Sequence, residues 1–171
     1  MPNWCANYVR VLHQDPAMMQ KFADAAKDGT IASTFVPEIH FPDKEGPYYL
    51  SPTQYSWRVD NWGTKWDFGI DDLRTDHDGS LTGYCETAWA PPVGIWYTLH
   101  NLGFKVNAYW HESGMCFAGQ FIEGTHDEHH DIDYSEECLS NLPPELVDMF
   151  GMESYSDYEE ETETEEEEDE T

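Results

Sequence analysis

The first clear pattern in the chain is an alternation of apolar and polar positions along residues 4–12, with the period of two that is typical of a β-strand. One face of this predicted strand carries Cys5, Asn7, Val9 and Val11. The period then changes to that of a helix: Asp15 suits the N-cap, Pro16 the first helical position and Gly29 the C-terminal end. We therefore expect a helix over residues 16–28.

Residues 30–54 have no regular period. Residues 31–36 are predicted to form a short extended piece. Prolines then recur every five residues, and proline removes a hydrogen-bond donor and biases the preceding residue towards extended backbone. We therefore expect residues 37–54 to form an irregular excursion of the folded domain.

Beyond residue 54 the pattern favours strands, with one further helix. Strands are expected at residues 55–60, 65–70, 81–88, 105–111 and 115–123, a helix at 92–102 and a polar connection at 71–80. We take the order of elements as strand–helix–strand–strand–helix–strand plus one more strand. This order predicts an α+β fold, a ferredoxin-like two-layer sandwich whose mostly antiparallel sheet has two helices on one face. The domain is expected to span residues 1–124.

The composition changes after residue 124. Residues 125–152 form an acidic, histidine-rich extension, in which residues 142–150 are predicted to form a short amphipathic helix that begins at two prolines. Residues 153–171 hold 12 acids and no base. Because such a segment repels itself and has few apolar side chains to bury, we expect a disordered acidic tail.

The net charge of −27 is unevenly distributed along the chain. Residues 1–122 hold 14 Asp and Glu and all eight Lys and Arg, whereas residues 123–171 hold 21 acids and no Lys or Arg. Nucleic acids and anionic membranes need Lys or Arg to neutralise phosphates, so neither is an expected partner. A basic protein is expected instead, because opposite charges attract over long range.

The tail supplies the acids that we expect to contact this partner. They are Glu159, Glu160, Glu161, Glu163, Glu165, Glu166, Glu167, Glu168, Asp169 and Glu170. One hypothesis is a nucleic-acid mimic that inhibits a host DNA- or RNA-binding or defence protein, since the acids resemble the dense charge of a phosphate backbone. The alternative is a tail that only keeps the protein soluble.

Aromatic residues gather around residues 62–67 (WGTKWD). A candidate pocket consists of Asn7, Trp62, Lys65, Trp66, Asp67 and His111, with the lysine near an indole face as a cation–π pair. The alternative is an aromatic core, because clustered aromatic rings mostly serve packing. In a core, Trp66→Ala would cost about 3–5 kcal/mol if the indole is fully buried.

Three histidines of the extension are weak metal candidates. His126 and His130 are four residues apart and would share a face if the segment were helical, and His129 lies between them. No pair of cysteines with metal-ligand spacing accompanies them, and histidine-rich loops also occur as solvated spacers. We therefore expect neither a metal nor another cofactor.

The sequence also argues against catalysis. His111-Glu112 with Cys116 could support acid–base or thiol chemistry, but the pair lies at an expected hairpin turn and the cysteine follows a strand pattern that favours burial. The four cysteines are expected to be free thiols. None of the common catalytic motifs occurs, so we expect a protein without enzymatic activity.

Four segments together resemble a known family. Residues 1–7 (MPNWCAN), 62–67 (WGTKWD), 87–92 (TAWAPP) and 109–114 (YWHESG) are similar to signatures of the phage- and plasmid-encoded Api-like (YubB-type) proteins. The resemblance implies a ferredoxin-like domain and a cytoplasmic accessory protein of a mobile element, and it brings no activity with it. A phage assembly accessory, or a ligand-binding or catalytic module around Trp62 and Asp67, is the alternative function.

Overall fold

The alternation in residues 4–12 produces the centre of a six-stranded sheet in the computed structural model, which describes residues 3–41 and 50–155. The strands are β1 (Trp4–Leu12), β2 (Asp71–Thr75), β3 (Leu81–Ala88), β4 (Lys105–Glu112), β5 (Phe117–Ile122) and β6 (Thr125–His129). Their order across the sheet is β2-β3-β1-β4-β5-β6, and every neighbouring pair is antiparallel. The predicted α+β class with a mostly antiparallel sheet is therefore confirmed.

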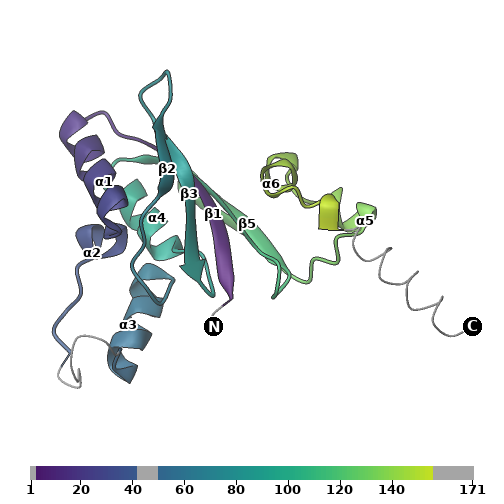
Figure 1. Ribbon diagram of the computed structural model, residues 1–171, viewed down its shortest axis with the longest axis horizontal. Coiled ribbons are helices and arrows are strands. Elements are labelled where there is room, and N and C mark those ends of the chain that lie inside the picture. Colours follow the sequence, from purple (N-terminus) through teal and green to yellow (C-terminus); the bar gives the residue numbers. More distant parts are fainter. Residues whose placement is uncertain (1–2, 42–49, 156–171) are drawn as a thin grey trace, which may run out of the picture.

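Four helices cover one face of this sheet, as Figure 1 shows. They are α1 (Pro16–Asp28), α2 (Ile31–Phe35), α3 (Pro52–Trp62) and α4 (Val93–Asn101). Asp15 and Gly29 limit α1 as predicted: the Asp15 carboxylate accepts the Ala17 N–H at 2.8 Å, and Gly29 adopts a left-handed φ of 72°. The helix expected at residues 92–102 is α4, one residue shorter at each end.

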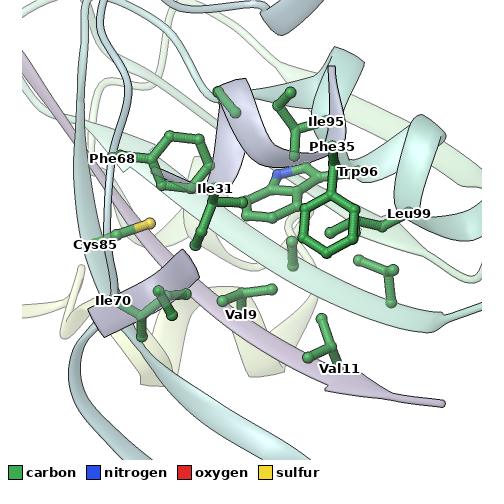
Figure 2. Close-up of a cluster of buried hydrophobic side chains, with 14 of the residues drawn as sticks. Val9, Val11, Ile31, Phe35, Phe68, Ile70, Cys85, Ile95, Trp96 and Leu99 are labelled. Atoms are coloured by element: carbon green, nitrogen blue, oxygen red, sulfur yellow. The ribbon is translucent and has the colours of Figure 1, made fainter. Parts of the chain in front are cut away.

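The main core lies between these helices and the sheet. Figure 2 draws 14 of its side chains, and the ten that are labelled come from β1, β3, α2, α4 and the segment before β2. Trp96 is fully buried at 0 % exposure, and its ring lies 5.8 Å from that of Phe68 in an edge-to-face arrangement. The predicted inward face of the first strand is also correct, because Cys5, Asn7, Val9 and Val11 all have 0 % exposure.

The C-terminal extension packs on the opposite face of the sheet. Its helices are α5 (Glu136–Leu139) and α6 (Pro144–Phe150), and α6 lies within the predicted residues 142–150 but begins two residues later. Their apolar side chains form a second core with Ala118 of β5, made of Ile132, Tyr134, Leu139, Leu142, Leu146, Val147 and Met152. Within residues 1–124 the helices lie on one face as predicted, although α1 to α4 take the place of the two that were expected, and the extension adds helices on the opposite face (Figure 1).

Several predicted elements are also corrected. Residues 55–60 belong to helix α3, which Ser51 caps by accepting the Gln54 N–H at 3.1 Å and which ends at Gly63. Residues 31–36 are not extended, because α2 occupies most of them. Residues 65–70 form no strand, and β2 lies instead in the predicted polar connection at 71–80.

The end of α3 depends on one glycine. Gly63 has a φ of 87°, and a Cβ at this position would lie 2.7 Å from the Pro91 carbonyl oxygen. Only glycine combines that backbone conformation with so close an approach. The glycine within the aromatic segment is thus needed to pack α3 against the start of α4.

The polar stretch that follows residue 124 adds a strand to the sheet. Residues Thr125–His129 form β6, which pairs with β5 and continues the sheet into the acidic extension. Of the tail predicted at residues 153–171, the structure describes only residues 153–155, and the remainder lies outside the described residues.

Candidate functional site

The six residues of the candidate pocket do not meet at one place. Asn7 faces the helices, with 0 % exposure, and its amide donates to the Cys5 carbonyl oxygen at 2.8 Å and to the Thr87 hydroxyl at 2.9 Å. The first bond stays within β1, the second joins β1 to β3, and together they hold the amide in the core. Asn7 therefore serves the packing of the sheet.

Trp62 is a hub of the aromatic core. Its side chain is 1 % exposed, its indole N–H donates to the Val36 carbonyl oxygen at 2.9 Å, and the Arg58 guanidinium lies 4.6 Å from its ring centroid. Arg58 in turn pairs with Glu38. The indole therefore ties α3 to the segment after α2, which is the packing role expected of a buried tryptophan.

Asp67 caps a helix. Its carboxylate accepts the N–H of Ala32 at 2.7 Å and that of Ser33 at 3.1 Å, at the start of α2. It also accepts the N–H of Phe68 at 3.0 Å. Orphan N–H groups at a helix start need such an acceptor, so this carboxylate stabilises α2.

Trp66 lies at the surface, in contrast to Trp62. Its side chain is 36 % exposed, the Lys65 ammonium lies 4.8 Å from its ring centroid, and the Trp4 ring lies 5.7 Å away. The expected cation–π pair between lysine and indole is therefore present. A shallow groove of about 290 Å³ adjoins the two tryptophans. The contact between Trp4 and Trp66 was not predicted, because it joins segments far apart in the sequence.

His111 belongs to the opposite face of the sheet. Its Nε2 is hydrogen-bonded to the Tyr134 hydroxyl at 2.9 Å, and Tyr155 stacks on Tyr134 at 5.0 Å. Burial lowers the pKa of His111, against a smaller opposing effect of Glu112, and burial raises the pKa of Tyr134 to about 12. This histidine therefore holds the C-terminal extension to the sheet.

Of the candidate metal ligands, His126 and His129 lie on strand β6 and His130 directly follows it, so none lies on a helix. His126 and His130 share a face with Glu128, whose carboxylate lies 4.0 Å from the first and 3.0 Å from the second. The alternation of a strand places His129 on the other face, 3.3 Å from Asp127. Within residues 3–41 and 50–155, no group of three or more His, Cys, Asp or Glu has an arrangement that could hold a metal ion.

The His111-Glu112 and Cys116 group lies at the hairpin between β4 and β5. Glu112 closes this turn by accepting the N–H groups of Gly114, at 3.0 Å, and Met115. The four cysteines are free thiols, as expected. Burial raises the pKa of Cys5 and Cys85, which disfavours the reactive thiolate in both.

The C-terminal extension supplies many exposed acids and no basic side chain. Residues 123–155 hold ten acids and no Lys or Arg. Nine of these acids have exposed side chains and together define the acidic surface: Glu123, Asp127, Asp131, Asp133, Glu136, Glu137, Glu145, Asp148 and Glu153. An open groove of about 800 Å³ runs between α5 and α6, lined by Glu136 and Asp148 beside the apolar Leu139 and Val147.

The charge of this extension follows from the sequence, whereas its structure does not. The docked helices hold the acidic surface on the folded domain, which charge alone does not predict. The tail acids from Glu159 to Glu170 lie outside the described residues. Arg10 pairs with Asp76 and Asp78 on the β2–β3 hairpin, away from the acidic surface.

The fold and this surface define an acidic α+β protein with a six-stranded antiparallel sheet. No family model and no curated protein matches the chain. One similar solved structure is that of protein api92 from Yersinia pseudotuberculosis, a DUF1281 protein, with 8% identity and a TM-score of 0.45 over 76% of this chain and 98% of that chain. This is a family-level resemblance to an Api protein, and a score so low carries no argument about fold or function. In the described part of the chain, no helix is both long and apolar enough to cross a membrane.

Proposed function

We propose that this protein is a non-catalytic binding module that docks on a basic surface of another protein. The observation that carries the proposal is the charge of residues 123–155, where ten acids without any Lys or Arg are attached to a folded scaffold. The Api-like resemblance of the sequence directs the search for the partner to a bacterial host and its phages.

Electrostatics supports this proposal in two ways. Nine exposed acids within one segment without Lys or Arg repel one another, and a basic partner that approaches them lowers this repulsion. Complementary charge also raises the rate of association and suppresses wrong partners. The groove between α5 and α6 adds apolar contact area beside the carboxylates, which an acidic segment that serves only solubility does not need.

We also propose a ferredoxin-like core for the domain. The strand order β2-β3-β1-β4 supports it, together with α1 between β1 and β2 and α4 between β3 and β4. Strands β5 and β6 and helices α5 and α6 are then additions to this core. An experimental structure with a different order of these four strands would reject this assignment.

An affinity capture from bacterial lysate, with the partner identified by mass spectrometry, tests the binding proposal. The native protein is compared with a variant in which Glu136, Glu137 and Asp148 are replaced by Gln or Asn. A matched control neutralises three exposed acids of the helix layer, Asp24, Asp28 and Asp60. We expect a basic protein that the native chain and the control enrich and that the first variant loses.

The same capture separates the finer possibilities. If duplex DNA or RNA competes with the protein for the captured partner, the protein acts as a nucleic-acid mimic; if neither competes, it binds another basic surface, such as that of a phage assembly partner. If no partner is enriched, or if both variants behave as the native protein does, the proposed function is wrong.

A further inference from the structure

The sheet has an open area on the face that carries α6. Because Cys5, Asn7, Val9 and Val11 point towards the helix layer, the alternate residues of β1 point the other way. Strand β3 pairs with β1 in register, which places Tyr84 beside Tyr8 and Glu86 beside Ala6 on this same open side. Helix α6 packs over β4 and β5, whereas on β1 and β3 the side chains of Trp4, Tyr84 and Glu86 are exposed and those of Ala6 and Tyr8 are half-buried.

Aromatic side chains occupy this face as two pairs, which we call together the aromatic strip. The aromatic strip consists of Trp66, Trp4, Tyr84 and Tyr8. The rings of Trp4 and Trp66 lie 5.7 Å apart, and those of Tyr8 and Tyr84 lie 5.0 Å apart in an edge-to-face arrangement. The exposure of Trp4 is 46 % and that of Tyr84 is 41 %, although such large apolar surfaces are normally buried.

Carboxylates lie beside this strip. Glu86 is exposed next to Ala6, and Asp71 is exposed opposite Tyr84 in the pairing of β2 with β3. Both acids line the groove of about 290 Å³ that Trp4 and Trp66 also form. Lys65 already lies 4.8 Å above the ring of Trp66, whereas in the described ranges no Lys or Arg lies over Trp4, Tyr8 or Tyr84.

We propose that the aromatic strip binds an extended arginine- or lysine-rich segment of the basic partner. The inference rests on the proposed function and names the surface that contacts the basic side chains of the partner. Ring faces attract a guanidinium or ammonium group through cation–π interactions, and Glu86 and Asp71 supply the opposite charge. The exposed rings of Trp4 and Tyr84, with the half-buried ring of Tyr8 beside Tyr84, are the positions that such a segment contacts.

Charge excludes the other occupants of this surface. The acids that follow residue 155 are repelled by Glu86 and Asp71, and a second copy of a chain with a net charge of −27 is repelled as a whole. Single-stranded nucleic acid also stacks on aromatic strips, but it needs a positively charged groove along its backbone. The carboxylates of this groove provide the opposite charge, which favours a basic peptide.

The test measures the dissociation constant of a fluorescent nona-arginine peptide for the full chain by anisotropy at physiological salt. We expect Trp4→Ala and Tyr84→Ala each to bind about 2- to 5-fold more weakly, the size of an exposed cation–π contact. Tyr84→Phe keeps the ring and should bind as the native protein does. Tyr97→Ala is the matched control, because Tyr97 is 40 % exposed but lies on α4, in the helix layer.

A second measurement needs no substitution. In NMR spectra of the native protein, the peptide should shift the indole N–H signals of Trp4 and Trp66 and leave those of the buried Trp62 and Trp96 unchanged. The inference is overturned if these signals do not move, or if Trp4→Ala and Tyr84→Ala bind like the native protein.

The outcome also separates this inference from the proposed function. If neutralising Glu136, Glu137 and Asp148 abolishes peptide binding while the aromatic variants retain it, the acidic surface alone recognises the partner and the strip does not. If the native protein enriches no basic partner from lysate, the proposed function fails whatever the peptide does.

Discussion

At the scale of single residues, Trp62 and Trp66 have different roles although they are four positions apart. Trp62 is 1 % exposed and hydrogen-bonded, whereas Trp66 is 36 % exposed at the edge of a groove. We expect Trp62→Ala to lower the free energy of unfolding by about 3–5 kcal/mol, the usual cost of removing a buried indole. Trp66→Ala should lower the free energy of unfolding by about 1 kcal/mol or less, because the side chain is partly exposed. The larger loss expected for a fully buried Trp66 therefore does not apply.

Urea unfolding of both variants at neutral pH measures this difference, because the midpoint and slope give the free energy. Each variant is the other's control, since both remove the same side chain from the same segment. Equal losses for the two would contradict the contrast in burial.

A second prediction at this scale concerns the pH dependence of His111. Burial lowers its pKa, so below the unfolded value of about 6.5 the unfolded chain binds more protons than the folded one. The neutral histidine therefore stabilises the fold above pH 6.5, and this stabilisation is lost as the pH falls through that value towards the folded pKa. An NMR titration should find a midpoint for His111 below 6.5.

A substitution of His111 separates its contribution to the pH dependence of stability from the contributions of the other seven histidines. His111→Gln removes the titration, so its stability should fall less steeply than that of the native protein between pH 7 and pH 5. A midpoint above 6.5, or identical slopes for the two proteins, would show that His111 is not buried against Tyr134.

At the scale of elements, the docking of α6 determines where the acidic surface lies. Leu146 has 0 % exposure and fills the second core, while its neighbour Glu145 is exposed. We expect Leu146→Ala to weaken this docking by about 2–5 kcal/mol. Amide hydrogen exchange of residues 144–150 should become faster in this variant and stay nearly unchanged in Glu145→Ala. Exchange that is equally slow in all three proteins would contradict the docked position.

The predicted and observed elements differ for physical reasons. The ends of α1 carry strong signals at Asp15 and Gly29, so its bounds could be read from the sequence. Helix α3 was predicted as a strand because Tyr55, Trp57 and Val59 alternate, although Ser51 and Gly63 supply the same kind of end signals. For α3, the capping residues at its two ends therefore predict the element better than the alternation does.

Strand β2 shows a limit of pattern reading. All but one of its residues are exposed, and it joins the sheet at the edge through backbone hydrogen bonds. A strand without a buried face has no apolar period, so no pattern could predict it. Sequence patterns also do not predict two further features: the contact between Trp4 and Trp66, and the partial cover that α6 gives to one sheet face. Both depend on how distant segments pack.

At the scale of the whole molecule, basic and acidic residues are unevenly distributed along the chain. All eight Lys and Arg precede residue 106, and 21 acids follow residue 122. This asymmetry was readable from the sequence and still supports the candidate function. The structure adds that the first ten of these acids belong to a folded domain, whose sheet also carries the aromatic strip with Glu86 and Asp71 next to it.

The measurement that tests the central claim most directly is the dissociation constant for the purified partner at about 0.05 and 0.2 M salt, where screening differs strongly. It is made for the native protein and for the variant with neutral residues 136, 137 and 148. We predict that affinity falls as salt rises, that the variant binds more weakly at both salt concentrations, and that its salt dependence is smaller. A native affinity that neither salt nor neutralisation changes would contradict recognition of a basic surface by these acids.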